Sequence, residues 1–465
     1  MKKNKLFRLM ALFLAGCLLA GCASAGGGVT TTAQNTTTVT TVAPTTTTTT
    51  VPTTATTTKA PTTTRKTTTA NVTVATTAAP LLKSSVDLMK NVNAAAVQEK
   101  AADDAFYKAQ WTFALKLANQ ANKQNNKNML VSPLSAQLAL AMLANGTAGT
   151  TKTQIEAVLG MKTEEYNRYA AAYVKTLTSG NRYTLAIANS LWVKRGMAVN
   201  KNFLQTNANY YNADVFQTDF DKQSVQDMNA WINEKTGGLI KEFDNEVDPA
   251  VLLSVFNTVA FDVQWLYQLD ENKTASGVFT TTDGRKQSAE YLYSQSEKNY
   301  IKDDKAQGII KEFSGPYSMA FVLPNEGITP EQYLSQLTAD GVKSLLSYKS
   351  EDKLESWGWE VLLPKFDYDY KTDLKAALQQ MGVSDLFTQG KADLSGISDG
   401  LFVRDADQKT TITMNECGVV ASGVSRYQVL KAAAVNYLPF DRPFVYMIID
   451  SNQLPIFVGT VTEMV

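Results

Sequence analysis

Apolar positions at helical spacing dominate the first part of the chain that has a mixed composition. Between Ala102 and Asn122, apolar side chains recur on one face and predict a helix. A second helix is predicted to begin at Ser132-Pro133, because serine is a favoured N-cap and proline fits the first helical position. It is predicted to end at Asn145-Gly146. Thr151-Lys152-Thr153-Gln154 has the form of a capping box and predicts the start of a third helix.

Strand-like apolar runs appear later in the chain. They lie at residues 185–193, 251–261, 319–323, 359–363, 445–449 and 456–461. Because helices cluster early and strands dominate late, the pattern predicts a mixed α and β (α+β) fold and not a strict βαβ repeat.

The N-terminus has the pattern of a targeting signal. Four basic residues precede an apolar run over residues 9–20, which is too short to span a bilayer. Leu19-Ala20-Gly21-Cys22 follows and resembles the lipobox of bacterial lipoproteins, in which the cysteine is acylated. We expect residues 1–21 to be a lipoprotein signal peptide and Cys22 to anchor the protein at the extracellular face of a bacterial membrane. Two alternatives remain open: use of Cys17, which leaves a shorter apolar run, and ordinary signal-peptidase cleavage without a lipid.

A threonine-rich segment separates this signal from the rest of the chain. From Thr30 to Ala79, 28 of 50 residues are threonine, and leucine, isoleucine and aromatic residues are absent. Such a segment cannot bury enough apolar surface to fold. We therefore predict a disordered stalk over residues 22–80, a transition segment over 81–100 and a folded domain over 101–465.

The amino-acid composition restricts the partners and reactions that the protein can have. The chain has 44 basic and 44 acidic residues and no histidine. Zero net charge gives no reason to expect a nucleic-acid partner. Without histidine, the usual base of Ser-His-Asp and Cys-His hydrolases and the commonest zinc ligand are missing, so we predict no metal, no cofactor and no enzymatic activity. Three cysteines cannot form a disulfide framework.

Nine short motifs in the predicted domain together resemble, in order, the signatures of the serpin family. They are Asn128–Ser135, Ala188–Val193, Asn229–Ile232 with Thr236–Ile240, Asn257–Phe261 with Trp265, Pro364–Phe366, Leu378–Phe387, Ala392–Gly396, Asp441–Phe444 and Phe457–Gly459. The resemblance implies a monomer with the serpin fold. That fold has a large central, mostly antiparallel sheet, smaller sheets, about eight or nine helices and an exposed reactive-centre loop.

The resemblance also implies a function. Glu416-Cys417-Gly418 matches the motif after which the reactive-centre loop leaves the sheet, and the family register places the scissile bond at Ala432-Ala433. The protein is then a suicide substrate of serine proteases: the loop is cleaved and inserts into the central sheet. Ala432 fits the small apolar S1 pocket of elastase-like or subtilisin-like proteases. A shift of one residue would instead make Lys431 the scissile residue and the target trypsin-like.

The hinge of this loop is where insertion would begin. Its residues are Glu416, Gly418, Val419, Val420, Ala421, Ser422 and Gly423. An inserted strand places alternate residues on opposite faces. The face that starts at Val419 carries no charge as far as Val429, whereas the other face carries Arg426. Inhibitory serpins usually have threonine or serine at the position of Val419, so a non-inhibitory serpin-fold surface binding protein or adhesin is the alternative function.

The resemblance further marks residues that tune opening of the sheet, the shutter and breach positions of the family. They are Ser132, Ser135, Asn257, Trp265 and Gln408. Gln408 stands where the family has a histidine. Its amide retains the capacity to hydrogen-bond Ser132 or Asn257, but not the pH sensitivity of an imidazole.

Overall fold

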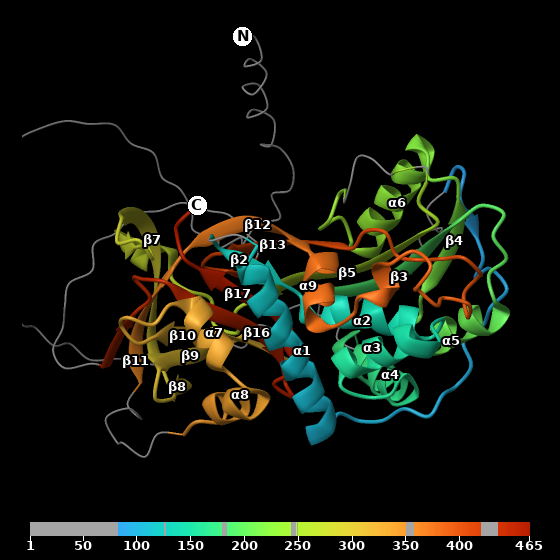
Figure 1. The fold of residues 1–465 in the computed structure, drawn as a ribbon. Coiled ribbons are helices and arrows are strands. Elements are labelled where there is room, and N and C mark those ends of the chain that lie inside the picture. The colour runs from blue at the N-terminus through green and yellow to red at the C-terminus, as the bar shows by residue number, and fades with distance from the viewer. Residues whose placement is uncertain are drawn as a thin grey trace, which may run out of the picture. The chain divides into compact units, whose positions relative to one another are not determined.

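The computed structural model describes residues 82–124, 127–178, 184–242, 248, 250–349, 358–419 and 436–465, with the backbone alone at 184, 257 and 258 (Figure 1). The predicted signal peptide and stalk, and most of the predicted reactive-centre loop, lie outside these ranges.

The largest sheet has seven strands. Their order is β1 (Val86–Asp87), β4 (Asp214–Thr218), β3 (Thr184–Lys194), β5 (Leu253–Gln264), β14 (Gly418–Val419), β13 (Asp407–Met414) and β12 (Phe366–Asp373). Only β3 and β4 pair in parallel; every other neighbouring pair is antiparallel. We call this the central sheet.

Two smaller sheets make up the remaining β structure of the described ranges. A six-stranded sheet has the order β2 (Met129–Val131), β17 (Pro455–Val461), β16 (Phe444–Asp450), β10 (Tyr317–Pro324), β9 (Ala306–Glu312) and β8 (Tyr300–Lys302). A four-stranded sheet has the order β15 (Asn436–Pro439), β11 (Trp359–Pro364), β7 (Lys286–Glu297) and β6 (Ala275–Thr280).

Nine α-helices occur within the described ranges. They are α1 (Asp104–Asn122), α2 (Pro133–Ala144), α3 (Gly149–Leu159), α4 (Thr163–Thr178), α5 (Lys201–Tyr211), α6 (Lys222–Lys235), α7 (Pro330–Gln336), α8 (Ala339–Leu346) and α9 (Leu374–Met381). The predicted mixed α and β fold with a large, mostly antiparallel central sheet is confirmed.

Helix α2 is buried between the sheets because its sequence is apolar on nearly every face. Leu138 and Met142 have no exposed surface, and the helix packs against β5 and β17. The predicted N-cap is confirmed, since Ser132 Oγ accepts a hydrogen bond from the Ser135 amide at 3.3 Å. This cap fixes Ser132 directly beneath the central sheet.

The predicted capping box at residues 151–154 is wrong. Helix α3 already begins at Gly149, and its N-cap Ala148 has no side-chain acceptor. Thr151 is buried and its hydroxyl accepts from the Asp393 amide at 3.0 Å, while Gln154 Oε1 accepts from two amides of the 384–385 segment. Tertiary partners therefore take both side chains away from the helix start.

Helix α6 covers the face of the central sheet opposite to α2 (Figure 1). Met228, Trp231 and Ile232 of the helix form a separate apolar cluster with Trp192 of β3 and Phe216 of β4. This cluster is smaller than the main core, so the helix is a cover on the sheet and not part of the central packing.

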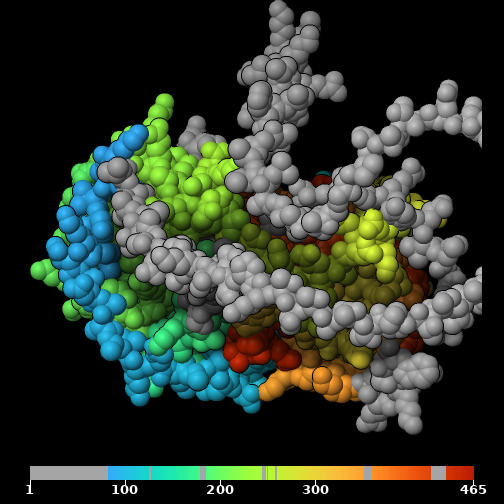
Figure 2. All heavy atoms as spheres, turned by 180° about the vertical axis from the view of Figure 1, so that it is seen from behind, coloured from blue at the N-terminus to red at the C-terminus, as the bar shows by residue number. Residues whose placement is uncertain are grey.

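Residues 82–100, which we call the strap, lie along the edge of the folded region. In Figure 2 the strap is the blue band against the green part of the surface. Its strand β1 pairs with β4. The buried carboxylate of Asp227 in α6 accepts hydrogen bonds from the amides of Lys83, Ser84 and Ser85 at 2.9–3.1 Å. The segment predicted as a transition thus carries an edge strand of the central sheet.

Candidate functional site

Two residues of the predicted hinge lie inside the central sheet. Gly418 and Val419 form β14, where they pair with Gln264 and Val263 of β5, and Val419 also pairs with Met414 of β13. Gly418 has φ +155°, and a Cβ there would lie 2.3 Å from the Val263 carbonyl oxygen. The close approach of the two backbones explains why this position is glycine.

Glu416 is held immediately before this strand. Its buried carboxylate lies 2.7 Å from Lys365 Nζ and accepts a hydrogen bond of 2.6 Å from the Thr274 hydroxyl. Its carbonyl oxygen accepts from the Leu269 amide at 3.0 Å. An ion pair and two hydrogen bonds thus fix the point from which the loop departs.

Trp265 lies beneath the same point. Its ring is buried and stacked on Phe313 with the centroids 4.5 Å apart. The indole N–H donates to the Asn415 carbonyl at 3.0 Å, and the backbone N–H donates to the Cys417 carbonyl at 2.9 Å. Trp265, one of the predicted shutter and breach residues, therefore binds the residues on both sides of Glu416.

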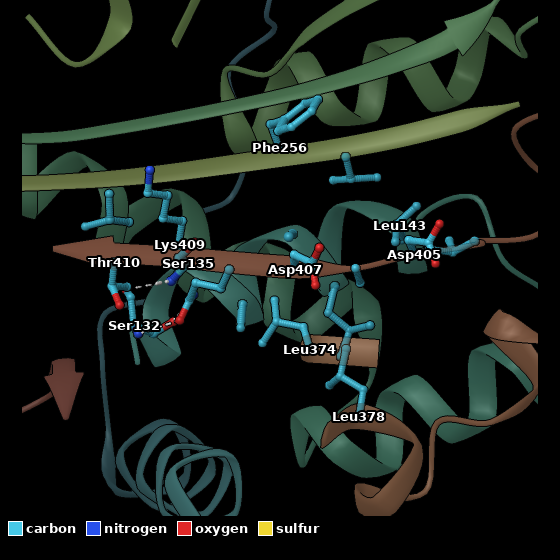
Figure 3. A pocket seen from close by; sticks show the side chains of 18 of the residues that line it. Ser132, Ser135, Leu143, Phe256, Leu374, Leu378, Asp405, Asp407, Lys409 and Thr410 are labelled. Carbon is cyan, nitrogen blue, oxygen red and sulfur yellow. Dashed lines mark hydrogen bonds between the residues drawn. The ribbon is translucent and has the colours of Figure 1, made fainter. Parts of the chain in front are cut away.

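Beyond β14, no backbone pairing joins β5 to β13 within the described ranges. A cavity of about 80 Å³ lies between the two strands, above α2 and α9 (Figure 3). Its lining includes Leu143, Phe256, Leu378 and Asp407. We call the space between β5 and β13 the slot.

Ser132 and Gln408 meet at the floor of the slot. The Gln408 side-chain oxygen accepts from the Ser132 amide at 2.8 Å, and its side-chain nitrogen donates to the Ser132 carbonyl at 2.9 Å. Ser132 Oγ also donates to the Ile456 carbonyl at 2.9 Å. The amide of Gln408 thus satisfies both backbone groups of one residue and links β13 to the start of α2.

The structure describes only some of the other residues that were predicted to form the site. Ser135 is buried in the first turn of α2. Asn257 occupies β5 opposite Asn189, but its side chain lies outside the described atoms. Residues 420–435, which include Val420, Ala421, Ser422, Gly423, Lys431, Ala432 and Ala433, lie outside the described ranges, as does Cys22.

The far end of the predicted loop joins a different sheet. Strand β15 begins at Asn436 and pairs in parallel with β11. The loop predicted from the sequence therefore starts in the central sheet and ends in the four-stranded sheet. Within the described part of the chain, no group of three or more acidic or cysteine side chains could hold a metal ion.

A family model described as "Serpin (serine protease inhibitor)" matches residues 108–464. The chain belongs to the serpin family. Human neuroserpin is 30% identical over 344 residues, which cover 70% of this chain and 82% of neuroserpin. Serpin B6 of Pongo abelii is 27% identical over 362 residues, or 74% of this chain and 95% of that protein.

Solved serpin structures are similar along most of the chain. A thermophilic serpin, tengpin, in its native state is 34% identical and superimposes with a TM-score of 0.75, covering 82% of this chain and all of tengpin. Its latent state is 33% identical and gives 0.69. The similarity supports the fold.

The partners of Glu416 were not predicted from the sequence. Lys365 was noted only as part of Pro364–Phe366, and Thr274 was not singled out. A sequence signal for the neighbouring strand was present. Residues 366–373 alternate strictly between buried and exposed positions, which indicates a strand that begins directly after Lys365.

Proposed function

We propose that this serpin is a suicide-substrate inhibitor of serine proteases, cleaved at Ala432-Ala433. The observation that carries the proposal is the position of β14, which enters the space between β5 and β13 and pairs with both. A loop that continued from Val419 would find hydrogen-bonding strands on either side.

The energetics favour such insertion. About ten new ladder bonds at roughly 1 kcal/mol net each, together with apolar burial, give a driving free energy of order 10 kcal/mol. Val419 is buried and pairs with Met414, whose side chain also faces the core. The uncharged face predicted from the sequence is therefore the one that would enter the core.

The chemistry is that of an interrupted proteolysis. The protease serine attacks the Ala432 carbonyl carbon and forms an ester with it, and the Ala433 nitrogen leaves as a new amine after taking up a proton. Water would then hydrolyse the ester in ordinary turnover. Insertion that is faster than this hydrolysis carries the attached protease away from the loop and preserves the ester.

The target preference follows from the scissile residue. Ala432 fits elastase-like or subtilisin-like proteases, whereas cleavage after Lys431 would indicate a trypsin-like target. The chain itself is not an enzyme in this proposal.

The location is part of the proposal. The basic and apolar N-terminal run followed by Leu19-Ala20-Gly21-Cys22 supports a lipid anchor on the extracellular face of a bacterial membrane. No helix in the described ranges is both long and apolar enough to cross a membrane. If a Cys22→Ala variant stays membrane-bound after signal cleavage, the anchor is refuted.

The decisive experiment is incubation with a panel of serine proteases. We expect an SDS-stable complex and a released C-terminal peptide that begins at Ala433 by mass spectrometry. A peptide that begins at Ala432 would transfer the scissile role to Lys431. Cleavage without any complex would favour the non-inhibitory binding protein or adhesin.

A matched pair of variants tests insertion itself. Ala421→Lys places a charge on the core-facing side of the inserted strand, where an unpaired charge costs several kcal/mol. Ser422→Lys places the same charge on the opposite face. We expect the first variant to be a substrate and the second to remain an inhibitor. Equal behaviour of the two would refute the insertion mechanism.

A further inference from the structure

The structure fixes which residues an inserted loop would meet. Gly418 opposes Gln264 and Val419 opposes Val263 in β5, and Val419 opposes Met414 in β13. Continuing both antiparallel registers by seven residues places Arg426 opposite Phe256 of β5 and Asp407 of β13. This inference rests on the proposed function, because it concerns the loop after cleavage.

Asp407 and an inserted Arg426 would lie on the same face of the central sheet. In β13, Gln408, Thr410, Ile412 and Met414 are buried, whereas the side chains between them point to the other face. Asp407 belongs to this second face, and its side chain is 33% exposed. Arg426 would lie on that face too, since the face alternates from Val419.

Asp407 can bind a second cation. One of its oxygens, Oδ2, lies 2.9 Å from Lys371 Nζ in β12, on the side away from the slot. An ionised carboxylate accepts several hydrogen bonds, and arginine presents a planar fork that suits it. Asp407 lines the slot, so it is reachable from the side on which Arg426 would arrive (Figure 3).

The neighbouring charges disfavour other registers. A slip by one residue would turn Arg426 toward the core, where a charge is costly. A slip by two residues in one direction would set Arg426 against Lys409, a like charge that also lines the slot. A slip by two in the other direction would set it against Asp405, which precedes β13 and is 69% exposed, so that water screens a charge pair there more than at Asp407.

We propose that Asp407 is a positioning residue that pairs with Arg426 of the cleaved loop and fixes the register of the inserted strand. Arg426 is the only charged residue between Val419 and Leu430. The pair would therefore form about midway through insertion and would select one alignment of an otherwise neutral strand.

The test is a charge exchange. Arg426→Glu and Asp407→Lys each place like charges opposite one another, and the double variant restores an opposite-charge pair. We expect each single variant to raise the number of inhibitor molecules consumed per trapped protease roughly two- to fivefold, the scale of a cross-strand charge pair. We expect the double variant to return to within about twofold of the native protein.

The melting temperature of the loop-cleaved form gives a second readout that needs no trapped protease. Both single variants should lower it relative to the cleaved native protein, and the double variant should recover it. Asp369→Lys, on the same face of β12 but away from the slot, is the matched control; it loses the hydrogen bond from Thr411, so it should lower the melting temperatures of the intact and cleaved forms equally and leave the number of inhibitor molecules consumed unchanged.

The outcomes separate the two proposals. Complex formation by the native protein with no recovery in the double variant would overturn the pairing and leave the inhibitory function intact. A cleaved native protein that melts no higher than the intact one would overturn both. Stabilisation on cleavage with recovery in the double variant, but without any complex, would support the pairing and refute inhibition.

Discussion

Replacing Glu416 tests whether the start of the loop is fixed as the structure indicates. In a Glu416→Gln variant the hydrogen bond from Thr274 is retained, but the ammonium group of Lys365 loses a carboxylate 2.7 Å away. The side chains of Lys365 and Glu416 are 18% and 5% exposed, so the lost partner is not replaced by bulk water.

The size of the effect follows from these surroundings. Removing one partner of a buried ion pair typically costs about 3–5 kcal/mol. Lys365 Nζ has a second carboxylate, that of Glu290, at 3.5 Å, and this group is 53% exposed. Because Glu290 compensates in part, we expect a loss of about 2–3 kcal/mol in the free energy of unfolding.

The assay is urea unfolding followed by tryptophan fluorescence, with the unfolding rate as the measure if refolding fails. Glu290→Gln is the matched control and should cost less than about 1 kcal/mol, as exposed pairs do. A double-mutant cycle with Lys365→Gln should give a coupling energy of at least about 1 kcal/mol. Equal losses for Glu416→Gln and Glu290→Gln would contradict the proposed anchoring.

Three further predictions concern other contacts. Asp227→Ala should destabilise the protein by about 2–4 kcal/mol and speed amide exchange in β1, because the strap loses a charged acceptor; unchanged exchange would show that β1 holds without it. Burial raises the pKa of Asp450 to about 6, so the stability it contributes is complete below about pH 4 and is lost as the pH rises toward 6. Relative to Asp450→Asn, the native protein should lose about 3 kcal/mol of unfolding free energy across that window. A difference in stability between the two proteins that does not change with pH would contradict this. Gln408→His should make stability fall below about pH 6.5, because an imidazolium cannot accept from the Ser132 amide; a variant as insensitive to pH as the native protein would refute the contact.

Local sequence signals predicted the elements that have a strong pattern of their own. The apolar run at 185–193 is contained in β3, and the runs at 445–449 and 456–461 fall within β16 and β17. The Ser132-Pro133 start was also correct, because an N-cap depends on residues close in sequence.

Elements that depend on distant partners were harder to predict. Strand β14 has two residues, and its conformation is set by β5 and β13, which lie more than 150 and about five residues away in the chain. Strand β1 follows a polar segment that is held by Asp227, 142 residues after Ser85. The hydrogen-bonding capacity of Gln408 was foreseen, but which of Ser132 or Asn257 it would contact was not.

The attachment of the strap to Asp227 determines what a cut in the preceding chain would release. Its fastening begins at Lys83, so proteolysis anywhere ahead of Leu82 would shed a domain whose seven-stranded sheet is whole. A cut between Asp87 and Asp103 would instead leave β1 held only by its pairing with β4 and its hydrogen bonds to Asp227, and loss of this fragment would expose β4 as a sheet edge, open to pairing with another chain. The position of this contact therefore decides whether a cut releases an intact domain or leaves a truncated form that is prone to aggregate.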